Sequence, residues 1–497
     1  MSLFATKSIE QIEVEQLGHG DRNLRRVLGP TQLIMLGVGA IIGTGIFVLT
    51  GQAAGANAGP AIVVSMIIAG VTSVLAALCY SEFAATVPVA GSAYTYAYAT
   101  LGEFIAWVIG WDLILEYALG AATVAVGWSG NLATLLQQLG LSFPAVISAA
   151  PGTAVAMAAG APVTAVFNVP AVLITLAVTA LLVIGVSESA TVNAVIVILK
   201  VAILIVIIAA GAFFIDPALW HPFIPPNTGT FGEYGWSGVL RGAGVIFFAY
   251  IGFDAVSTSA QEARNPQRDM PRGILGSLAV CTVLFVLASG VMVGLVPYKE
   301  MINQPAPLVV AMTAAAGRAA GTSWAPAMNA MLILLTVGAL AALSSVMVVM
   351  MMAQPRIFLA MSNDGLLPRW AGRVHPRFKT PYVSTIVTGA AVSVAAGLTP
   401  ISTLGQLVSI GTLLAFVIVS LGIIVLRRTR PDLPRPFRMP LVPLLPILSA
   451  LVAFVLMLGL PRATWARLII WMAIGFVVYG GYGHRRSRLR AAGEPAQ

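Results

Sequence analysis

The sequence predicts an all-α integral membrane protein with twelve membrane-spanning helices. Of its 497 residues, 58% are hydrophobic and only 9% are charged, against about 25% charged residues in soluble domains. Such a chain cannot cover a core with a polar surface. Apolar runs recur along it at the length of roughly 20 residues that a helix needs to cross a bilayer. A soluble enzyme, a disordered protein and a nucleic-acid-binding protein are therefore excluded, despite a formal net charge of +9.

The predicted elements begin after a charged amino-terminal segment, 1–30, which lacks the apolar core of a cleavable signal peptide. Long uniform apolar runs satisfy their backbone as helices rather than as barrel strands. The predicted spans are 31–56, 61–86, 103–128, 168–186, 192–214, 236–258, 273–295, 325–352, 382–398, 402–426, 441–460 and 464–482. Residues 142–166 are a possible thirteenth span. Because Pro144, Pro151 and Pro162 interrupt them, we expect an external loop or re-entrant cap within 129–167.

The positions of lysine and arginine decide between twelve and thirteen spans. With twelve, the segments on the side of the amino terminus hold 21 of the 27 basic residues, as cytoplasmic loops do. A thirteenth span would move 17 of them to the outside. We therefore predict twelve spans with both termini in the cytoplasm.

Glycines in the first and sixth spans predict that these two helices are discontinuous. Gly43-Thr-Gly45 places three small residues at mid-membrane depth, and Gly242-Ala-Gly244 precedes Phe247 in a similar pattern. Small residues also allow close helix packing. Breaks at positions one and six favour a five-plus-five inverted repeat with a substrate at the midplane. The predicted organisation is a cytoplasmic segment 1–30, repeats 31–214 and 236–426, a helix pair 441–482 and a cytoplasmic tail 483–497.

Each break leaves N–H groups on one side and C=O groups on the other without helical partners. The N–H end attracts a carboxylate, and the C=O end accepts hydrogen bonds from an ammonium group. A zwitterionic α-amino acid satisfies both ends at once. Other zwitterions and small polar solutes would also fit.

Several motifs, in order along the chain, now identify a family. They are Gly43-Thr-Gly-Ile-Phe47, Tyr80-Ser-Glu-Phe-Ala84, Pro88-Val-Ala-Gly-Ser-Ala-Tyr94, Phe247-Phe-Ala-Tyr-Ile-Gly-Phe-Asp254, Glu262-Ala-Arg-Asn-Pro266, Pro355-Arg356 and Asp364-Gly-Leu-Leu-Pro368. Over about residues 20–485 the chain resembles the amino acid–polyamine–organocation superfamily, specifically bacterial relatives of the cationic amino acid transporters. The resemblance implies the LeuT-type fold and secondary transport of L-amino acids by alternating access across a bacterial plasma membrane. Because the family carries both cationic and neutral amino acids, it leaves the substrate open.

The resemblance also assigns a substrate-binding set. Backbone amides of Thr44 and Gly45 would bind the carboxylate, and carbonyls of Ile41, Phe248, Ala249 and Ile251 would bind the amine. None of these residues is acidic, and Leu343 would add an apolar wall, so we expect neutral amino acids such as alanine rather than arginine. A Cβ at Gly45 would obstruct the carboxylate, so Gly45→Val should fold without binding. Tyr250 is either an aromatic lid or an ordinary packing residue.

Lys200 is the only charged residue between Thr191 and Ile215, and ionisable groups at membrane depth are expected to be functional. In the family, a lysine on span five replaces the sodium ion of relatives and ties span one to span eight. Ser344 and Ser345 are the polar groups available to Lys200 on span eight, unless they bond their own helix. We therefore expect a proton as coupling ion, no sodium site and no cofactor.

Glu116 is the best candidate for an acidic partner of Lys200, and it lies on the same helix face as Asp112. Alternatively, Glu116 forms hydrogen bonds only with nearby hydroxyl groups. Arg241 would lie in the external vestibule or reach water. The candidate gate charges, which topology alone could also explain, are Glu82, Glu262, Arg264, Arg268 and Arg356.

The sequence lacks the residue patterns that an enzyme, a metal site, an ATP-driven transporter or a channel would need. The four histidines lie outside the spans without metal-ligand spacing, Cys79 and Cys281 lie in apolar runs, and no GxxxxGK[ST] loop is present. Intramembrane charge is too sparse for the continuous polar lining of a channel. A membrane enzyme, a metal site, a disulfide framework and ATP-driven transport by this chain are therefore not expected. No nucleic acid or ATPase subunit is expected as a partner. A cationic amino acid carrier or exchanger and a non-transporting amino acid sensor remain as alternatives.

Overall fold

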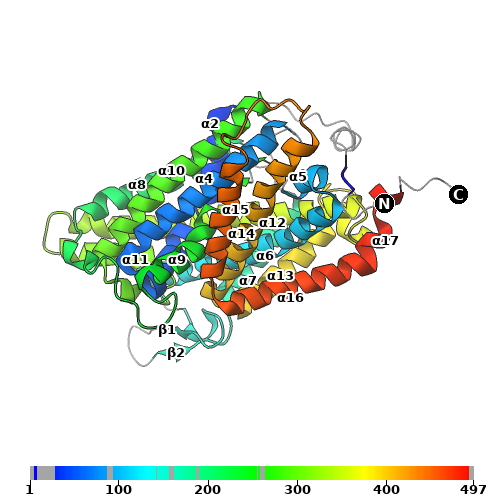
Figure 1. Ribbon diagram of the computed structural model, residues 1–497. Helices are drawn as coiled ribbons and strands as arrows, with labels where there is room; N and C mark the ends of the chain where they lie inside the picture. Colours follow the sequence, from blue (N-terminus) through cyan, green and yellow to red (C-terminus); the bar gives the residue numbers. More distant parts are fainter. Residues whose placement is uncertain are drawn as a thin grey trace.

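The computed structural model is a bundle of long helices that lie side by side, with a small hairpin at one end (Figure 1). It describes residues 5–7, 28–86, 93–141, 143–155, 162–185, 190–254, 256–257 and 263–491. The predicted all-α class is confirmed, because helices form most of the described chain.

The α-helices are α2 (Pro30–Ile41), α3 (Thr50–Ala53), α4 (Ile62–Thr86), α5 (Ala93–Thr100), α6 (Glu103–Gln138), α7 (Val169–Ile184), α8 (Ala190–Ala212), α9 (Gly235–Ile246), α10 (Pro266–Leu295), α11 (Pro307–Ala319), α12 (Ala325–Asn363), α13 (Tyr382–Leu398), α14 (Ile401–Thr429), α15 (Leu444–Gly459), α16 (Arg462–Val478), α17 (His484–Arg486) and α18 (Arg488–Ala491). Turns of π-helix cover Gly45–Leu49, Ala54–Ala58 and Tyr479–Gly483. Turns of 3₁₀-helix include Gly59–Ala61, Phe247–Tyr250 and Tyr298–Met301. The strands are β1 (Ala154–Val155) and β2 (Val163–Thr164).

Within the described residues, seven stretches of helix are long and apolar enough to cross a membrane, and five further apolar helices are shorter. The longest stretch, Gly45–Thr86, is interrupted at Gly59, where φ is +61° and only glycine avoids strain. The shorter helices include α2, which stops at the first predicted break, and α11. A multi-pass membrane protein is thus established, while the exact count of twelve spans and the inverted repeat stay predictions.

Helix starts follow local sequence signals. Proline opens α2, α10 and α11, where a missing N–H and a fixed φ cost nothing. Asn168 precedes α7, and its side chain accepts a hydrogen bond from the Ala171 N–H at 3.2 Å. These signals place several helix boundaries within a few residues of the predicted spans.

Three elements refine the sequence-based expectations. The segment 143–155 and 162–168 contains the β1–β2 hairpin and a short 3₁₀ turn, which agrees with the expected loop rather than a thirteenth span. Helices α5 and α11 were not expected, because their 8 and 13 residues are too short for a span. Both pack against longer helices, α5 against α6 and α11 against α12.

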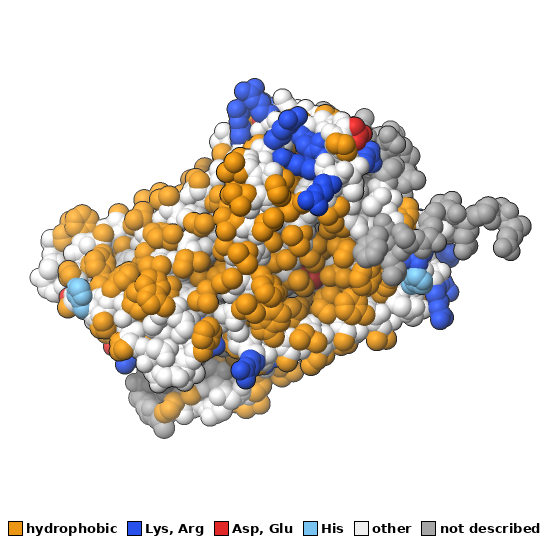
Figure 2. Space-filling model, in the orientation of Figure 1, with side chains coloured by type: hydrophobic (Ala, Val, Ile, Leu, Met, Phe, Trp, Pro, Cys, Tyr) orange, Lys and Arg blue, Asp and Glu red, His pale blue; other side chains and the backbone are white. Residues whose placement is uncertain are grey.

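An apolar belt covers the outside of the bundle. Figure 2 shows hydrophobic side chains over most of the visible face, with lysine and arginine gathered at its upper end. The belt includes strongly exposed residues such as Leu173, Ile198 and Val477, at 60%, 60% and 75% exposure. Exposed apolar surface of this extent is expected where lipid, not water, surrounds the helices.

Hydrogen bonds from tryptophan side chains join α16 to α6. Trp111 donates from Nε1 to the Trp471 carbonyl at 2.9 Å, and Trp471 donates back to the Trp111 carbonyl at 3.0 Å. Their rings are stacked, with centroids 4.7 Å apart. Trp107 donates to the Gly475 carbonyl at 3.1 Å. Helix α16 is therefore attached by polar contacts as well as by packing.

Both ends of the chain reach the same end of the bundle. The Lys7 ammonium lies 2.7 Å from the Asp364 carboxylate, at the end of α12. The Arg488 N–H donates to the Asp364 carbonyl at 3.1 Å. Both tails therefore meet at Asp364, at one end of the bundle.

Candidate functional site

The first helix break lies where the sequence predicted it. Helix α2 ends at Ile41, and Ile42 adopts an extended conformation with φ −72° and ψ 100°. After Gly43 and Thr44, a π-helical turn starts at Gly45. A Cβ built at Gly43 would lie only 3.1 Å from the Val346 side chain of α12, so this turn packs tightly.

The second break follows α9. A 3₁₀ turn covers Phe247–Tyr250, and Ile251 is extended with ψ 138°. Gly252 has φ +116°, and a Cβ there would lie 2.9 Å from the Ala40 carbonyl carbon and oxygen. The left-handed backbone and the close approach both require glycine. The second break is thereby held against the end of α2.

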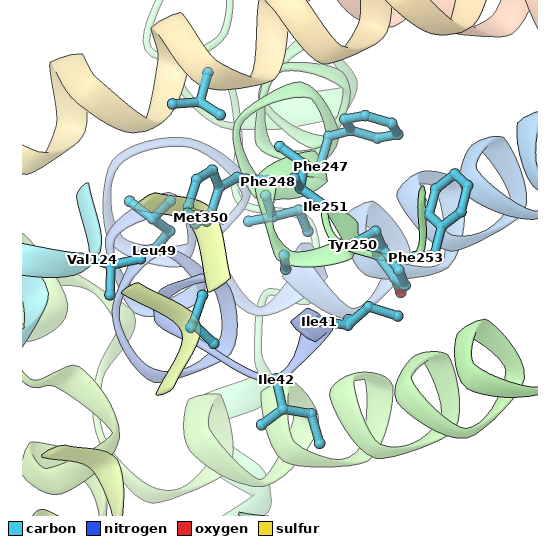
Figure 3. Packing of buried hydrophobic residues seen from close by; sticks show 14 of the residues in the cluster. Ile41, Ile42, Leu49, Val124, Phe247, Phe248, Tyr250, Ile251, Phe253 and Met350 are labelled. Atoms are coloured by element: carbon cyan, nitrogen blue, oxygen red, sulfur yellow. The ribbon is translucent and has the colours of Figure 1, made fainter. Parts of the chain in front are cut away.

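The two breaks touch each other (Figure 3). A Cβ built at Gly45 would lie 2.2 Å from the Ala249 Cα, so the two backbones are in direct contact. In Figure 3, Ile41 and Ile42 of the first break lie beside the turn that carries Phe248 and Ile251. The structure therefore brings together all six residues of the predicted binding set: Ile41, Thr44, Gly45, Phe248, Ala249 and Ile251.

Polar groups at the first break lack partners. Thr44 is 1% exposed, and its Oγ1 has no hydrogen-bond partner among the described residues. Gly45 opens a helical turn, in which the Phe47 N–H donates to the Gly43 carbonyl at 3.3 Å. The N–H groups before Phe47 lie at the start of the turn, where helices lack intrahelical acceptors. Gly127 of α6 makes room for Thr44, since a Cβ there would lie 3.0 Å from Thr44 Cγ2. The break presents donors and a hydroxyl in a buried place.

The surroundings of the breaks are apolar. Phe248 is 4% exposed and approaches Gly120 of α6, and Met350 of α12 approaches the same glycine. Leu343 and Val346 of α12 are also buried, at 0% and 3% exposure. Figure 3 shows Val124 and Met350 beside the first break. None of these neighbouring residues is acidic.

Lys200 binds the first broken helix. It is 1% exposed on α8, and its Nζ donates to the Gly39 carbonyl of α2 at 2.9 Å. Gly39 lies two residues before the end of α2, among carbonyls that the break leaves without helical partners. The expected link between spans five and one is therefore present in the geometry.

The serines of α12 have other surroundings. Ser344 donates to the Leu340 carbonyl of its own helix at 2.8 Å and accepts from Trp128 Nε1 at 3.0 Å. It is thus bonded within α12 and to α6. Ser345 is half-buried on the same helix.

Glu116 does not pair with Lys200. It is 2% exposed on α6, and its Oε2 has no hydrogen-bond partner among the described residues. The charged groups that act on it are Asp112 and Asp254, with Thr412 as a hydroxyl neighbour. Asp254 in turn accepts from the Tyr117 hydroxyl at 3.0 Å. The sequence suggested Glu116 as an acidic partner for Lys200, whereas its charged neighbours are Asp112 of its own helix and Asp254 that follows the second break.

Tyr250 contacts α4 and α10. Its hydroxyl donates to the Met66 carbonyl of α4 at 3.0 Å, and its ring meets Phe285 of α10 edge-on at 5.7 Å. These contacts give Tyr250 a packing role, and its role as a lid stays a prediction. Arg241 donates from Nε to the Gly459 carbonyl at 3.1 Å, where a cation stabilises the end of α15.

Among the gate candidates, Glu82 accepts hydrogen bonds from Arg427 and from the backbone at Met439. It is fully buried and accepts from Arg427 Nε and Nη2 at 2.8 and 2.6 Å, and from the Met439 N–H at 2.7 Å. Arg264, Arg268 and Arg356 are exposed. Glu262 lies outside the described residues.

Sequence reasoning missed Glu103, which is fully buried at the start of α6. It accepts from Tyr479 and Arg490 at 2.9 and 3.1 Å, and from Ser487. An acid between aromatic residues at the start of a span was the available signal. No group of three or more possible metal ligands occurs in the described part of the chain.

Comparison with known proteins agrees with this geometry. A family model described as amino acid permease matches residues 28–479. The branched-chain amino acid permease BcaP of Bacillus subtilis (strain 168) is 43% identical over 490 residues, covering 98% of this chain and 99% of that protein. The methylthioribose transporter of the same organism is 41% identical over 492 residues, covering 98% and 99%.

A plant protein extends the comparison. The vacuolar cationic amino acid transporter 4 of Arabidopsis thaliana is 38% identical over 433 residues, covering 87% of this chain and 68% of that protein. The resemblance predicted from the motifs is confirmed. The chain belongs to the amino acid permease family of the amino acid–polyamine–organocation superfamily.

Proposed function

We propose that this permease carries neutral L-amino acids across the plasma membrane by alternating access, driven by protons. The observation that supports it best is the meeting of two broken helices at Gly45 and Ala249. Backbone N–H groups, backbone C=O groups and the Thr44 hydroxyl lie there within one buried, apolar region.

In the proposed complex, the substrate carboxylate accepts hydrogen bonds from the N–H groups of Thr44 and Gly45. The positive end of the helical turn that Gly45 opens adds electrostatic attraction. The substrate ammonium donates to carbonyls of Ile41, Phe248, Ala249 and Ile251. All of these contacts use the α-amino and α-carboxyl groups that every amino acid shares.

Side-chain selectivity would come from the apolar wall. Phe248, Leu343, Val346 and Met350 are buried around the breaks. A cationic side chain pressed against them without a carboxylate would lose its hydration uncompensated. The name of the relative BcaP, a branched-chain amino acid permease, supports a neutral substrate. A cationic amino acid and methylthioribose are the competing substrates that the other relatives suggest.

Proton coupling would reside on Lys200. Its protonated amine donates to the Gly39 carbonyl and so holds α8 to α2. Loss of the proton would weaken this link and favour the inward release of substrate. The proposal includes twelve spans in a LeuT-type inverted repeat, with both termini in the cytoplasm. Their shared end of the bundle supports an even number of spans.

The test is uptake into proteoliposomes that contain the purified protein. We expect accumulation of alanine or branched-chain amino acids when an inward proton gradient is imposed, and weak uptake of arginine and methylthioribose. Arginine as the tightest ligand, with neutral amino acids inert, would overturn the substrate assignment. Amino acid binding without uptake or exchange would instead identify a sensor.

A further inference from the structure

A cleft of about 690 Å³ opens at the end of the bundle where α10 begins. Arg268, Arg272 and Leu275 of α10 line one wall, and Pro436 and Phe437 line the other. The second wall belongs to the loop between α14 and α15. The cleft is separate from the two helix breaks and has no part in the proposed transport.

The two arginines of this cleft have no described partner. Arg268 and Arg272 are four residues apart, so they share one face of α10. Both are exposed, and neither forms a hydrogen bond or an ion pair through its side chain with any residue that the structure describes. The acid between them is occupied elsewhere, since Asp269 Oδ2 accepts from the Asn265 N–H at 3.2 Å. Their positive charges remain available to a ligand.

The opposite wall is held in place by several side-chain hydrogen bonds to backbone carbonyls. Arg435 donates to the carbonyls of Arg430 and Leu433 at 2.6 and 2.9 Å, so the loop folds around its side chain. Arg427 donates to the Met439 carbonyl at 2.8 Å. The segment that carries Phe437 is therefore fixed at both ends, and the cleft is preformed.

An exposed apolar stripe continues from the arginines along α10. Val280, Val283 and Leu287 follow Arg272 on the same helical face and are 41%, 59% and 48% exposed. Helix α4 lies beside α10 and exposes Ile67 and Val71 at 45% and 54%. In Figure 2, basic side chains gather at the upper end of the visible face, and hydrophobic side chains cover much of the surface below them. The two arginines therefore lie at one end of an exposed apolar stripe.

We propose that this cleft binds the headgroup of an anionic glycerophospholipid of the phosphatidylglycerol class. Its phosphodiester accepts hydrogen bonds from Arg268 and Arg272, and guanidinium groups bind phosphate oxygens with strong, charge-assisted geometry. One acyl chain lies along the stripe of Val280, Val283 and Leu287. Basic pockets between helices at the membrane surface are suited to such headgroups.

The continuity of charge and apolar stripe distinguishes a lipid from a soluble phosphate. A free phosphate would bind only the two arginines, and the apolar stripe would remain uncovered. A lipid uses both features, because its headgroup and its chain are covalently joined. The glycerol hydroxyls of the headgroup would face Asn265 and Gln267, which line the polar part of the cleft.

The experiment measures bound lipid by native mass spectrometry of delipidated protein titrated with phosphatidylglycerol or phosphatidylcholine. The double variant Arg268→Gln, Arg272→Gln should weaken phosphatidylglycerol binding by about tenfold or more, because each basic group contributes to the attraction. The matched control is Arg369→Gln, Arg373→Gln. It removes the same charge from exposed arginines outside the cleft and should bind lipid as the wild type does.

Two further arms separate the outcomes. Inorganic phosphate and the soluble headgroup glycerophosphoglycerol should fail to displace the lipid at equal concentration; displacement by either assigns the cleft to soluble phosphates and overturns the proposal. Equal losses in the two double variants indicate general surface charge and also overturn it. If the double variant does not fold, the wild type decides: a preference for phosphatidylglycerol that high salt does not weaken contradicts the arginine assignment.

Discussion

Gly45 is the residue at which the two helix breaks meet, and its missing side chain allows the contact. A Cβ there would lie 2.2 Å from the Ala249 Cα, so backbone must move even in Gly45→Ala. Overpacking of this kind costs about 1–3 kcal/mol. We expect a lower melting temperature and an affinity for the neutral substrate at least about tenfold weaker, measured by thermal shift and by titration calorimetry.

The control is Gly290→Ala on α10. A Cβ at Gly290 would meet only Val63 at 3.7 Å, an ordinary contact, so its stability and binding should match the wild type. Unchanged substrate affinity in Gly45→Ala would remove Gly45 from the site. The structure adds to the sequence-based expectation for Gly45→Val, since that variant now disturbs both the carboxylate site and the packing of the breaks.

At the scale of elements, Lys200 connects α8 to α2 through the Gly39 carbonyl at 2.9 Å. Lys200→Met keeps the length of the side chain and removes its proton. Proton-driven accumulation in proteoliposomes should be abolished, whereas substrate exchange survives. The unpaired Gly39 carbonyl should also lower stability by about 1–3 kcal/mol.

Arg318→Met is the matched control, because Arg318 also donates to a carbonyl near α8, that of Phe214 at 2.6 Å, but at an exposed place. It should retain coupling. Full gradient stimulation in Lys200→Met, or none in the wild type, would make Lys200 structural. The coupling proton would then be sought at Glu116, whose Oε2 is buried without a partner.

The elements that sequence could predict are those with a local cause. The first break follows from Gly43 and Gly45, and Lys200 stood out as a lone charge in an apolar run. Helix α11 was not predicted, because its 13 residues are too few to cross a bilayer. The contact of Gly45 with Ala249 and the turn of Glu116 toward Asp254 depend on segments far apart in the chain. No periodicity encodes which helix faces which.

At the scale of the whole molecule, Glu103 holds the carboxyl-terminal tail to the bundle. It is fully buried and accepts from Tyr479 at 2.9 Å and from Arg490 at 3.1 Å. Glu103→Gln removes the negative charge that Arg490 faces. We expect a loss of about 1–3 kcal/mol in stability and faster tryptic cleavage between Arg485 and Arg490.

Asp432→Asn provides the comparison. Asp432 lies 3.8 Å from Arg430 in an exposed pair, and such pairs contribute little. Its melting temperature and tail cleavage should equal those of the wild type. If Glu103→Gln behaves in the same way, the tail is held by packing alone.

The indole contacts of α16 have a consequence for the biogenesis of the chain. Helix α6 is synthesised long before α16, yet the indoles of Trp107 and Trp111 find their acceptors only on α16. Until that helix inserts, two donors face lipid, where an unsatisfied polar group costs several kcal/mol. A premature stop codon before Arg462 would leave this exposure permanent. Such a truncated product would expose the two indole N–H groups on an apolar surface. A membrane protease could distinguish it from the full-length protein by these polar groups.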